Sequence, residues 1–102
     1  MLSIGEQIRK LREEHRLPLR KVAAELDIDQ SILSKIERGE RNASKAQIIQ
    51  IARIFKIDEK ELLVNYLSDR VLYDLKDEEL ARDALRVAEM KIKYLTNRQN
   101  GK

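Results

Sequence analysis

The chain has few of the residues that catalysis, cross-linking or tight loops require. Its 102 residues include no cysteine, no tryptophan, one histidine, one proline and three glycines. Without cysteine it cannot form a disulfide, a thiolate zinc site or a cysteine nucleophile, which suits a reducing compartment. A single histidine is too few for a zinc site of the usual composition. We therefore expect no metal, no other cofactor and no catalytic residue.

Long hydrophobic runs and phosphate-binding glycine loops are also missing. The amino terminus is charged from Glu6 onward, so it reads as neither a signal peptide nor a membrane span. The neighbouring acids Glu13 and Glu14, and likewise Glu78 and Glu79, lie in expected helices, where adjacent side chains diverge rather than converge on a substrate. The sequence predicts a cytoplasmic protein that is no enzyme and does not bind membranes.

The composition favours a helical globular protein. Hydrophobic residues make up 42% and charged residues 38% of the chain, a mixture unlike that of a disordered chain. The net charge is +3, but residues 1–57 hold twelve basic side chains against eight acidic ones, whereas residues 58–102 hold nine against ten. The basic excess thus lies in the first part, where a polyanion could dock.

Five helices are expected before residue 64. Their apolar residues recur at helical spacing, for example Ile4, Ile8 and Leu11 in the first. Pro18 reads as the first-turn residue of the second helix, and Gly39 as the stop of the third. The expected elements are residues 4–15, 18–26, 30–38, 45–56 and a helix from 59, with Ser3, Asp29, Ser44 and Asp58 as N-caps.

The second and third of these helices are joined by a very short connection. Only Asp27, Ile28 and Asp29 separate them, and the small pair Ala23 and Ala24 lets two helices approach closely. Two short helices with such a turn predict a helix-turn-helix motif. In that motif the second helix is presented on the surface, so that its outward side chains can enter a major groove.

At this point the residues resemble a known family. Residues 8–63 are similar to the phage-repressor/Cro-like, or xenobiotic-response-element, helix-turn-helix family, through "IRKLRE", "KVAAELDI" and "SKIERGERNAS" in that order. The resemblance implies an all-α fold, a five-helix lambda-repressor-like helix-turn-helix domain. It also implies a bacterial or phage DNA-binding transcription regulator, with repression as the commoner outcome.

The resemblance also implies roles for individual residues. Two positions depart from the family pattern: Leu19 stands where relatives carry a phosphate-touching Gln, and Ala43 where they carry Pro. The alternatives to DNA contact are a solvated helix face for the base-contact set and ordinary surface charge for the phosphate set. The implied assignments are base contact by Gln30, Ser31, Ser34 and Lys35, phosphate contact by Arg20, Lys21, Arg38, Arg41 and Asn42, and a structural ion pair of Arg12 with Glu37.

Residues 64–102 fall outside the family pattern and predict two long amphipathic helices. The first continues the fifth helix to about Leu75, and the second runs from an N-cap at Asp77 to about Thr96. Their apolar stripes favour a second copy of the protein as partner, although the helices could instead wrap back on their own domain. The expected dimer interface comprises Leu67, Val71, Leu75, Leu85, Ala88, Ile92 and Leu95.

These elements predict three segments and one function. The segments are a DNA-binding domain at residues 1–63, a helical dimerisation extension at 64–97 and a frayed tail at 98–102. The function is a homodimeric regulator that binds a palindromic operator in double-stranded DNA. The alternatives are a restriction-modification controller or an antitoxin of the same fold, and a protein-interaction module with a vestigial helix-turn-helix. In those alternatives a toxin or another regulator is a further protein partner.

Overall fold

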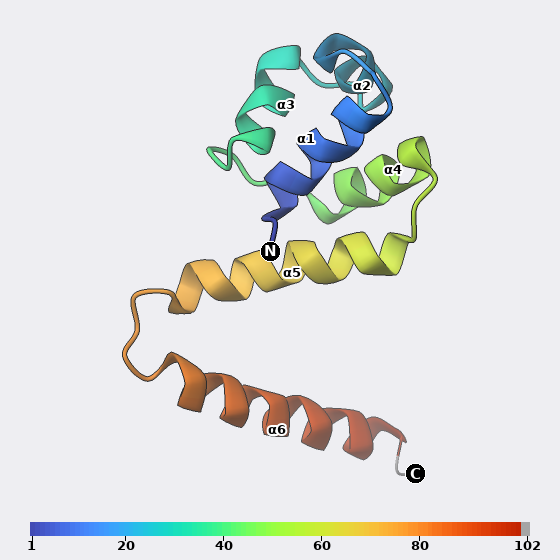
Figure 1. Cartoon of the computed structure of the whole chain (residues 1–102). Helices are drawn as coiled ribbons and strands as arrows, with labels where there is room; N and C mark the ends of the chain where they lie inside the picture. The colour runs from blue at the N-terminus through green and yellow to red at the C-terminus, as the bar shows by residue number, and fades with distance from the viewer. Residues whose placement is uncertain (101–102) are drawn as a thin grey trace. The chain divides into compact units, whose positions relative to one another are not determined.

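The computed structural model describes residues 1–100, in which helices joined by turns and short loops are the only regular secondary structure (Figure 1). The expected all-α class is confirmed, with six helices rather than five once the C-terminal extension is included. The helices are α1 (Ile4–Glu14), α2 (Leu19–Glu25), α3 (Gln30–Glu37), α4 (Lys45–Phe55), α5 (Glu59–Leu75) and α6 (Ala81–Asn100).

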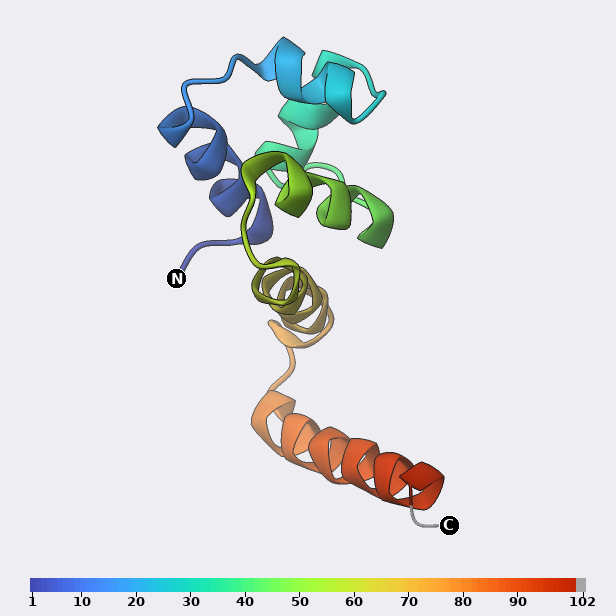
Figure 2. The same cartoon turned by 90° about the vertical axis from the view of Figure 1, so that its right-hand side faces the viewer.

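The chain forms two compact units, of which the first is Met1–Arg70 and the second begins at Val71. The first unit has a single hydrophobic core to which all five of its helices contribute. Ile8, Leu33, Ile48 and Leu62 are completely buried there. Within this unit α3 packs against α2 and α1, on the side away from α5 (Figures 1 and 2).

The N-termini of α1 and α4 are closed by the expected caps. Ser3 and Ser44 each accept a hydrogen bond from the backbone N–H three residues on, and Glu6 and Gln47 reach back to the serine N–H groups. These two capping boxes satisfy N–H groups that a helix otherwise leaves without partners. At α5, Asp58 accepts from the backbone N–H of Lys60 at 3.0 Å.

The starts of α2 and α3 have no side-chain caps, and that of α2 differs from the prediction. Pro18 is the N-cap of α2 rather than its first helical residue, and Asp29 occupies the N-cap of α3 without a side-chain hydrogen bond. Both residues have extended backbone, with ψ of 154° and 144° respectively. Asp29 is thus the N-cap of α3 as predicted, whereas α2 begins one residue later than predicted.

Contacts between α1 and its neighbours hold the first unit together. The side chain of Asp69 on α5 accepts a hydrogen bond from the Ile4 N–H at 2.7 Å, and Asn65 Nδ2 donates to Gln7 Oε1 at 2.6 Å. Gly5 lies so close to α3 that an added Cβ would be 2.5 Å from the Ile36 carbonyl oxygen. Only glycine permits this approach of the two helices.

The second unit departs from expectation at both ends of its long helix. Asp77 lies in the turn between α5 and α6, and α6 begins at Ala81, so Asp77 is not its N-cap. The Glu78 N–H instead donates to the Leu75 carbonyl, and the Ala81 N–H donates to the Glu78 carbonyl, which makes this link a pair of turns. At the other end α6 continues past Thr96 to Asn100, so residues 98–100 of the expected tail are helical. Residues 101–102 lie outside the described part.

Candidate nucleic-acid interface

A tight turn connects α2 to α3 and fixes how α3 is presented. Asp27 adopts the left-handed backbone conformation with φ of 57°, which aspartate tolerates better than most residues because its side chain is short and polar. The next residue, Ile28, donates its N–H to the Ala23 carbonyl at 3.0 Å. Helices α2 and α3 pack against each other, with Ala23 and Leu33 both buried in the core, so the pair forms the motif expected from the sequence.

The two sides of α3 differ in size and polarity. Leu33, Ile36 and Glu37 are buried against the rest of the unit. On the opposite side Gln30, Ser31 and Lys35 are exposed and Ser34 is half-buried. The structure therefore brings all four predicted base-contact residues onto one outward row, in which two are short serines and two are longer hydrogen-bonding side chains.

An ion pair fastens α3 to α1 beneath this row. Arg12 Nε donates to Glu37 Oε2 at 2.8 Å, and Arg12 Nη2 donates to Glu37 Oε1 at 3.1 Å. Arg12 Nη1 also donates to the Leu17 carbonyl at 3.1 Å. The Glu37 side chain is only 5% exposed, and its hydrogen bonds raise the pKa of Arg12. This two-pronged geometry fixes the orientation of α3 as well as its position.

The C-terminal end of α3 carries a second ion pair, this one exposed. Arg38 Nε donates to Glu40 Oε2, and Arg38 Nη1 donates to Ser34 Oγ. The Arg38 hydrogen bond lowers the pKa of the Glu40 carboxyl and raises that of Arg38. The guanidinium assigned to a phosphate is thus held by protein groups, and Glu40 was not among the residues that the sequence singled out.

Comparisons with known proteins agree with this geometry. The family model for helix-turn-helix proteins matches residues 8–62, more than half of the chain. The chain belongs to the helix-turn-helix family. It is of the Cro/C1 type, similar to the xenobiotic-response-element regulators. These are DNA-binding transcription regulators and not enzymes. No curated protein sequence matches the chain.

Three solved structures have a similar fold. The restriction-modification controller protein C.AhdI from Aeromonas hydrophila is 32% identical, with a TM-score of 0.54 over 58% of this chain and 89% of its own. The clp gene regulator ClgR from Corynebacterium glutamicum is 20% identical, with a TM-score of 0.56 over 86% and 88%. The complex of the SinR and SinI proteins is 20% identical, with a TM-score of 0.54 over 92% and 98%. The last two show the likeness of fold alone.

The Leu19 departure from the helix-turn-helix pattern has a structural explanation. Leu19 is half-buried and packs against the core at the first turn of α2. It therefore makes an apolar contact where the family pattern has a polar side chain. The remaining phosphate candidates, Arg20, Lys21, Arg41 and Asn42, are all exposed. Ala43, the second departure, is buried in the core.

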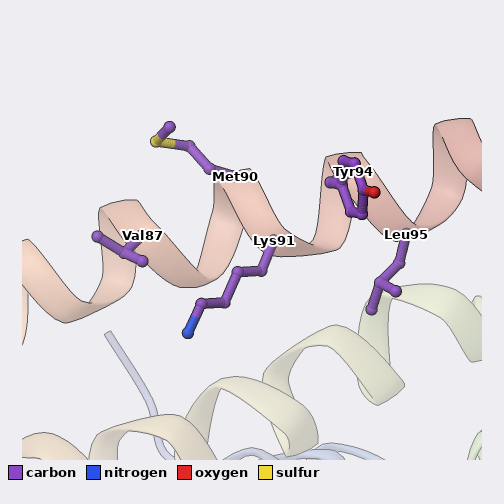
Figure 3. Close-up of a pocket in the computed structure, with 5 residues that line it drawn as sticks. All are labelled: Val87, Met90, Lys91, Tyr94 and Leu95. Carbon is purple, nitrogen blue, oxygen red and sulfur yellow. The ribbon is translucent and has the colours of Figure 1, made fainter.

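Helices α5 and α6 of this helix-turn-helix protein each leave apolar side chains exposed. No side chain of Ala81–Gln99 is buried, and Leu85, Ile92 and Leu95 are 45%, 63% and 57% exposed. A shallow apolar hollow on α6 is lined by Val87, Met90, Lys91, Tyr94 and Leu95, with Met90 and Lys91 projecting to different sides of the helix (Figure 3). On α5, Leu67 and Val71 are also exposed, while Leu75 is half-buried.

Metal clusters and membrane-spanning helices were sought among the described residues, with negative results. No group of three or more His, Cys, Asp or Glu side chains among residues 1–100 could hold a metal ion. Within the same range no helix is both long and apolar enough to cross a bilayer.

Proposed function

We propose that the chain is a sequence-specific regulator that binds double-stranded DNA as a homodimer and represses transcription by occupying a palindromic operator. The observation that carries the proposal is the outward row of α3, where Gln30, Ser31, Ser34 and Lys35 lie over a face fixed by a buried ion pair. Gln matches the hydrogen-bonding edge of adenine, Lys matches the guanine acceptors, and Ser tolerates either. In this proposal the protein acts in the cytoplasm, with its target DNA.

Phosphate contacts supply most of the affinity in this mechanism. Arg20, Lys21, Arg38, Arg41 and Asn42 surround the reading row in sequence and are exposed. Contacts to phosphate fix the register of the protein on the duplex and make binding depend on salt, whereas base contacts provide the discrimination. The unit that contains residues 1–63 would therefore bind DNA by itself, although weakly.

Dimerisation is the proposed task of residues 64–97. Seven apolar residues on α5 and α6 form the interface, namely Leu67, Val71, Leu75, Leu85, Ala88, Ile92 and Leu95. On α6 the spacing alternates between three and four residues from Ala81 through Leu85, Ala88 and Ile92 to Leu95, the pattern of a helix pair. Two copies would present two α3 helices about one helical turn (~34 Å) apart on DNA.

The first test is selection of bound sequences from a pool of random DNA duplexes. We expect a palindromic consensus with half-sites about one turn apart, and loss of that consensus in the Gln30→Ala/Lys35→Ala variant. Weak binding across the whole pool, unchanged by the two substitutions, would contradict the operator mechanism. Interaction of α6 with another protein would then be the better interpretation.

A second candidate within the same class is the control of a restriction-modification operon. The 32% identity to the controller C.AhdI favours it. That likeness takes in only 58% of this chain, so a controller of this length would carry an additional helical segment. Selection would distinguish this role if the consensus matched the promoter of an adjacent nuclease or methyltransferase gene.

A further inference from the structure

An acidic side chain stands among the groups that we assign to phosphate binding. Helix α3 ends in a Schellman turn, in which the Gly39 N–H donates to the Ile36 carbonyl at 3.1 Å and the Glu40 N–H donates to the Lys35 carbonyl at 2.9 Å. Gly39 has φ of 77°, the conformation that this turn requires. The turn folds Glu40 back over the last turn of α3, beside Lys35.

The Glu40 carboxylate forms an ion pair with the Arg38 guanidinium. It accepts a hydrogen bond from Arg38 Nε, while Arg38 Nη1 reaches Ser34 Oγ. Lys35 adds a second positive charge that acts on the same carboxylate. Glu40 thus forms an ion pair with Arg38, a proposed phosphate ligand, and attracts Lys35, a proposed base-contact residue.

The Arg38–Glu40 ion pair is exposed to solvent and is therefore weak. The Arg38 and Glu40 side chains are 51% and 55% exposed, and ion pairs in such positions hold together weakly. A carboxylate at the C-terminal end of a helix is also disfavoured by the helix dipole. The Arg12–Glu37 pair differs in exposure, because the Glu37 side chain is only 5% exposed.

We propose that Glu40 is a positioning residue that restrains DNA binding, because it holds Arg38 against Ser34 until a phosphate displaces it. The inference rests on the proposed function and adds a determinant of affinity to it. A phosphate oxygen and the Glu40 carboxylate compete for the same guanidinium donors, since both are anionic acceptors suited to arginine. Glu40 also repels the incoming phosphate. It therefore lowers affinity for every DNA sequence.

The test measures the binding of a mixed-sequence DNA duplex across a range of salt concentrations. We expect Glu40→Gln to bind about three- to tenfold more tightly at about 50 mM salt, and the salt dependence to steepen by about 0.9 for each additional phosphate that the protein neutralises. Glu40→Asp, which keeps the charge, should remain near the wild type. Glu61→Gln, which removes the same charge from the groove between α1 and α5, should change neither quantity.

A double-mutant cycle separates the capture of Arg38 from general repulsion. In an Arg38→Gln background, the increase in affinity from Glu40→Gln should largely vanish, because the released donor is no longer there. The same increase in both backgrounds, or an increase equal to that of Glu61→Gln, would overturn the inference. Unchanged thermal unfolding of each variant shows that the fold is intact.

The outcomes also distinguish this inference from the proposed function. If the wild type binds the duplex and Glu40→Gln binds it equally well with the same salt dependence, only the role of Glu40 is refuted. If neither protein binds the duplex at any salt concentration, the DNA-binding proposal fails and the role of Glu40 fails with it.

Discussion

Helices α4 and α6 are both amphipathic, yet only α4 buries its apolar side chains within the chain. Helix α4 has 11 residues and buries Ile48, Ile51, Ala52 and Phe55. Helix α6 has 20 residues, and none of its side chains from Ala81 to Gln99 is buried. Apolar side chains at helical spacing are thus buried in the core of the first unit but exposed on α6 in the second. A stripe in the sequence identifies a face that needs a partner, but it does not say which molecule supplies that partner.

The comparison is tested most strongly by truncating one leucine in each unit. Leu33 is completely buried, so Leu33→Ala should lower the free energy of unfolding of the first unit by about 2–5 kcal/mol. Leu85 is 45% exposed, and Leu85→Ala should leave that unfolding transition unchanged. Denaturant unfolding monitored at several protein concentrations provides the measurement. A comparable loss for both variants, independent of concentration, would show that α6 belongs to the core.

The next largest effect concerns the ion pair that fixes α3. Arg12→Ala leaves the Glu37 carboxylate, which is 5% exposed, without its charged partner. We expect a loss of about 2–4 kcal/mol in the free energy of unfolding, because a buried charge is then uncompensated. Arg9→Ala is the matched control, since Arg9 pairs with Glu13 across an exposed surface. An equal, small effect of the two substitutions would contradict the structural role of the pair.

A smaller loss is expected where the helix backbones meet. Adding a methyl group in Gly5→Ala forces α1 away from the Ile36 carbonyl, since the new Cβ would lie 2.5 Å from that oxygen. Overpacking of this kind costs about 1–3 kcal/mol, measurable by thermal unfolding. Ala46→Gly, at an exposed position inside α4, changes the same two residue types in reverse and should cost only about 1 kcal/mol. A Gly5→Ala protein as stable as the wild type would refute the close approach.

The smallest effect depends on pH and compares the two capping boxes. Hydrogen bonding to the Ser3 backbone N–H lowers the pKa of Glu6 below its ordinary 4.5. A folded-state pKa below the unfolded value means that Glu6 stabilises the fold above pH 4.5 and loses this contribution as the pH falls through the lowered pKa. The stability difference between the wild type and Glu6→Gln should therefore shrink in acid. Gln47→Ala removes a neutral cap and should cost the same at every pH.

Much of the first unit could be predicted because local and tertiary signals agree there. Ser3 and Ser44 precede apolar spacing and do cap helices, and the short connection at residues 27–29 is the turn of the motif. The pairing of Arg12 with Glu37, which only the family resemblance implied, is present in the structure as a pair of hydrogen bonds.

What the sequence did not reveal depends on residues far apart in the chain. The bond from Ile4 N–H to Asp69 and the closeness of Gly5 to Ile36 follow from how helices pack, which periodicity cannot show. Tyr66, which lies beyond the residues that resemble the family, is buried in the core. Glu40 was overlooked because its importance comes from the turn at Gly39, which folds it back beside Arg38. The start of α6 was misplaced because Asp77 looks like a cap, although its neighbours form turns.

The most direct test of the division of labour uses DNA containing either the selected palindrome or a single half-site. Ile92→Asp places a charge on the α6 stripe at a side chain that is 63% exposed, and Asn97→Asp places the same charge on the polar side of that helix. We predict that Ile92→Asp loses the advantage of the palindrome but keeps the half-site affinity, whereas Asn97→Asp behaves as the wild type. Equal palindrome binding by the Ile92→Asp and wild-type proteins would contradict the proposal that α6 joins two DNA-binding copies.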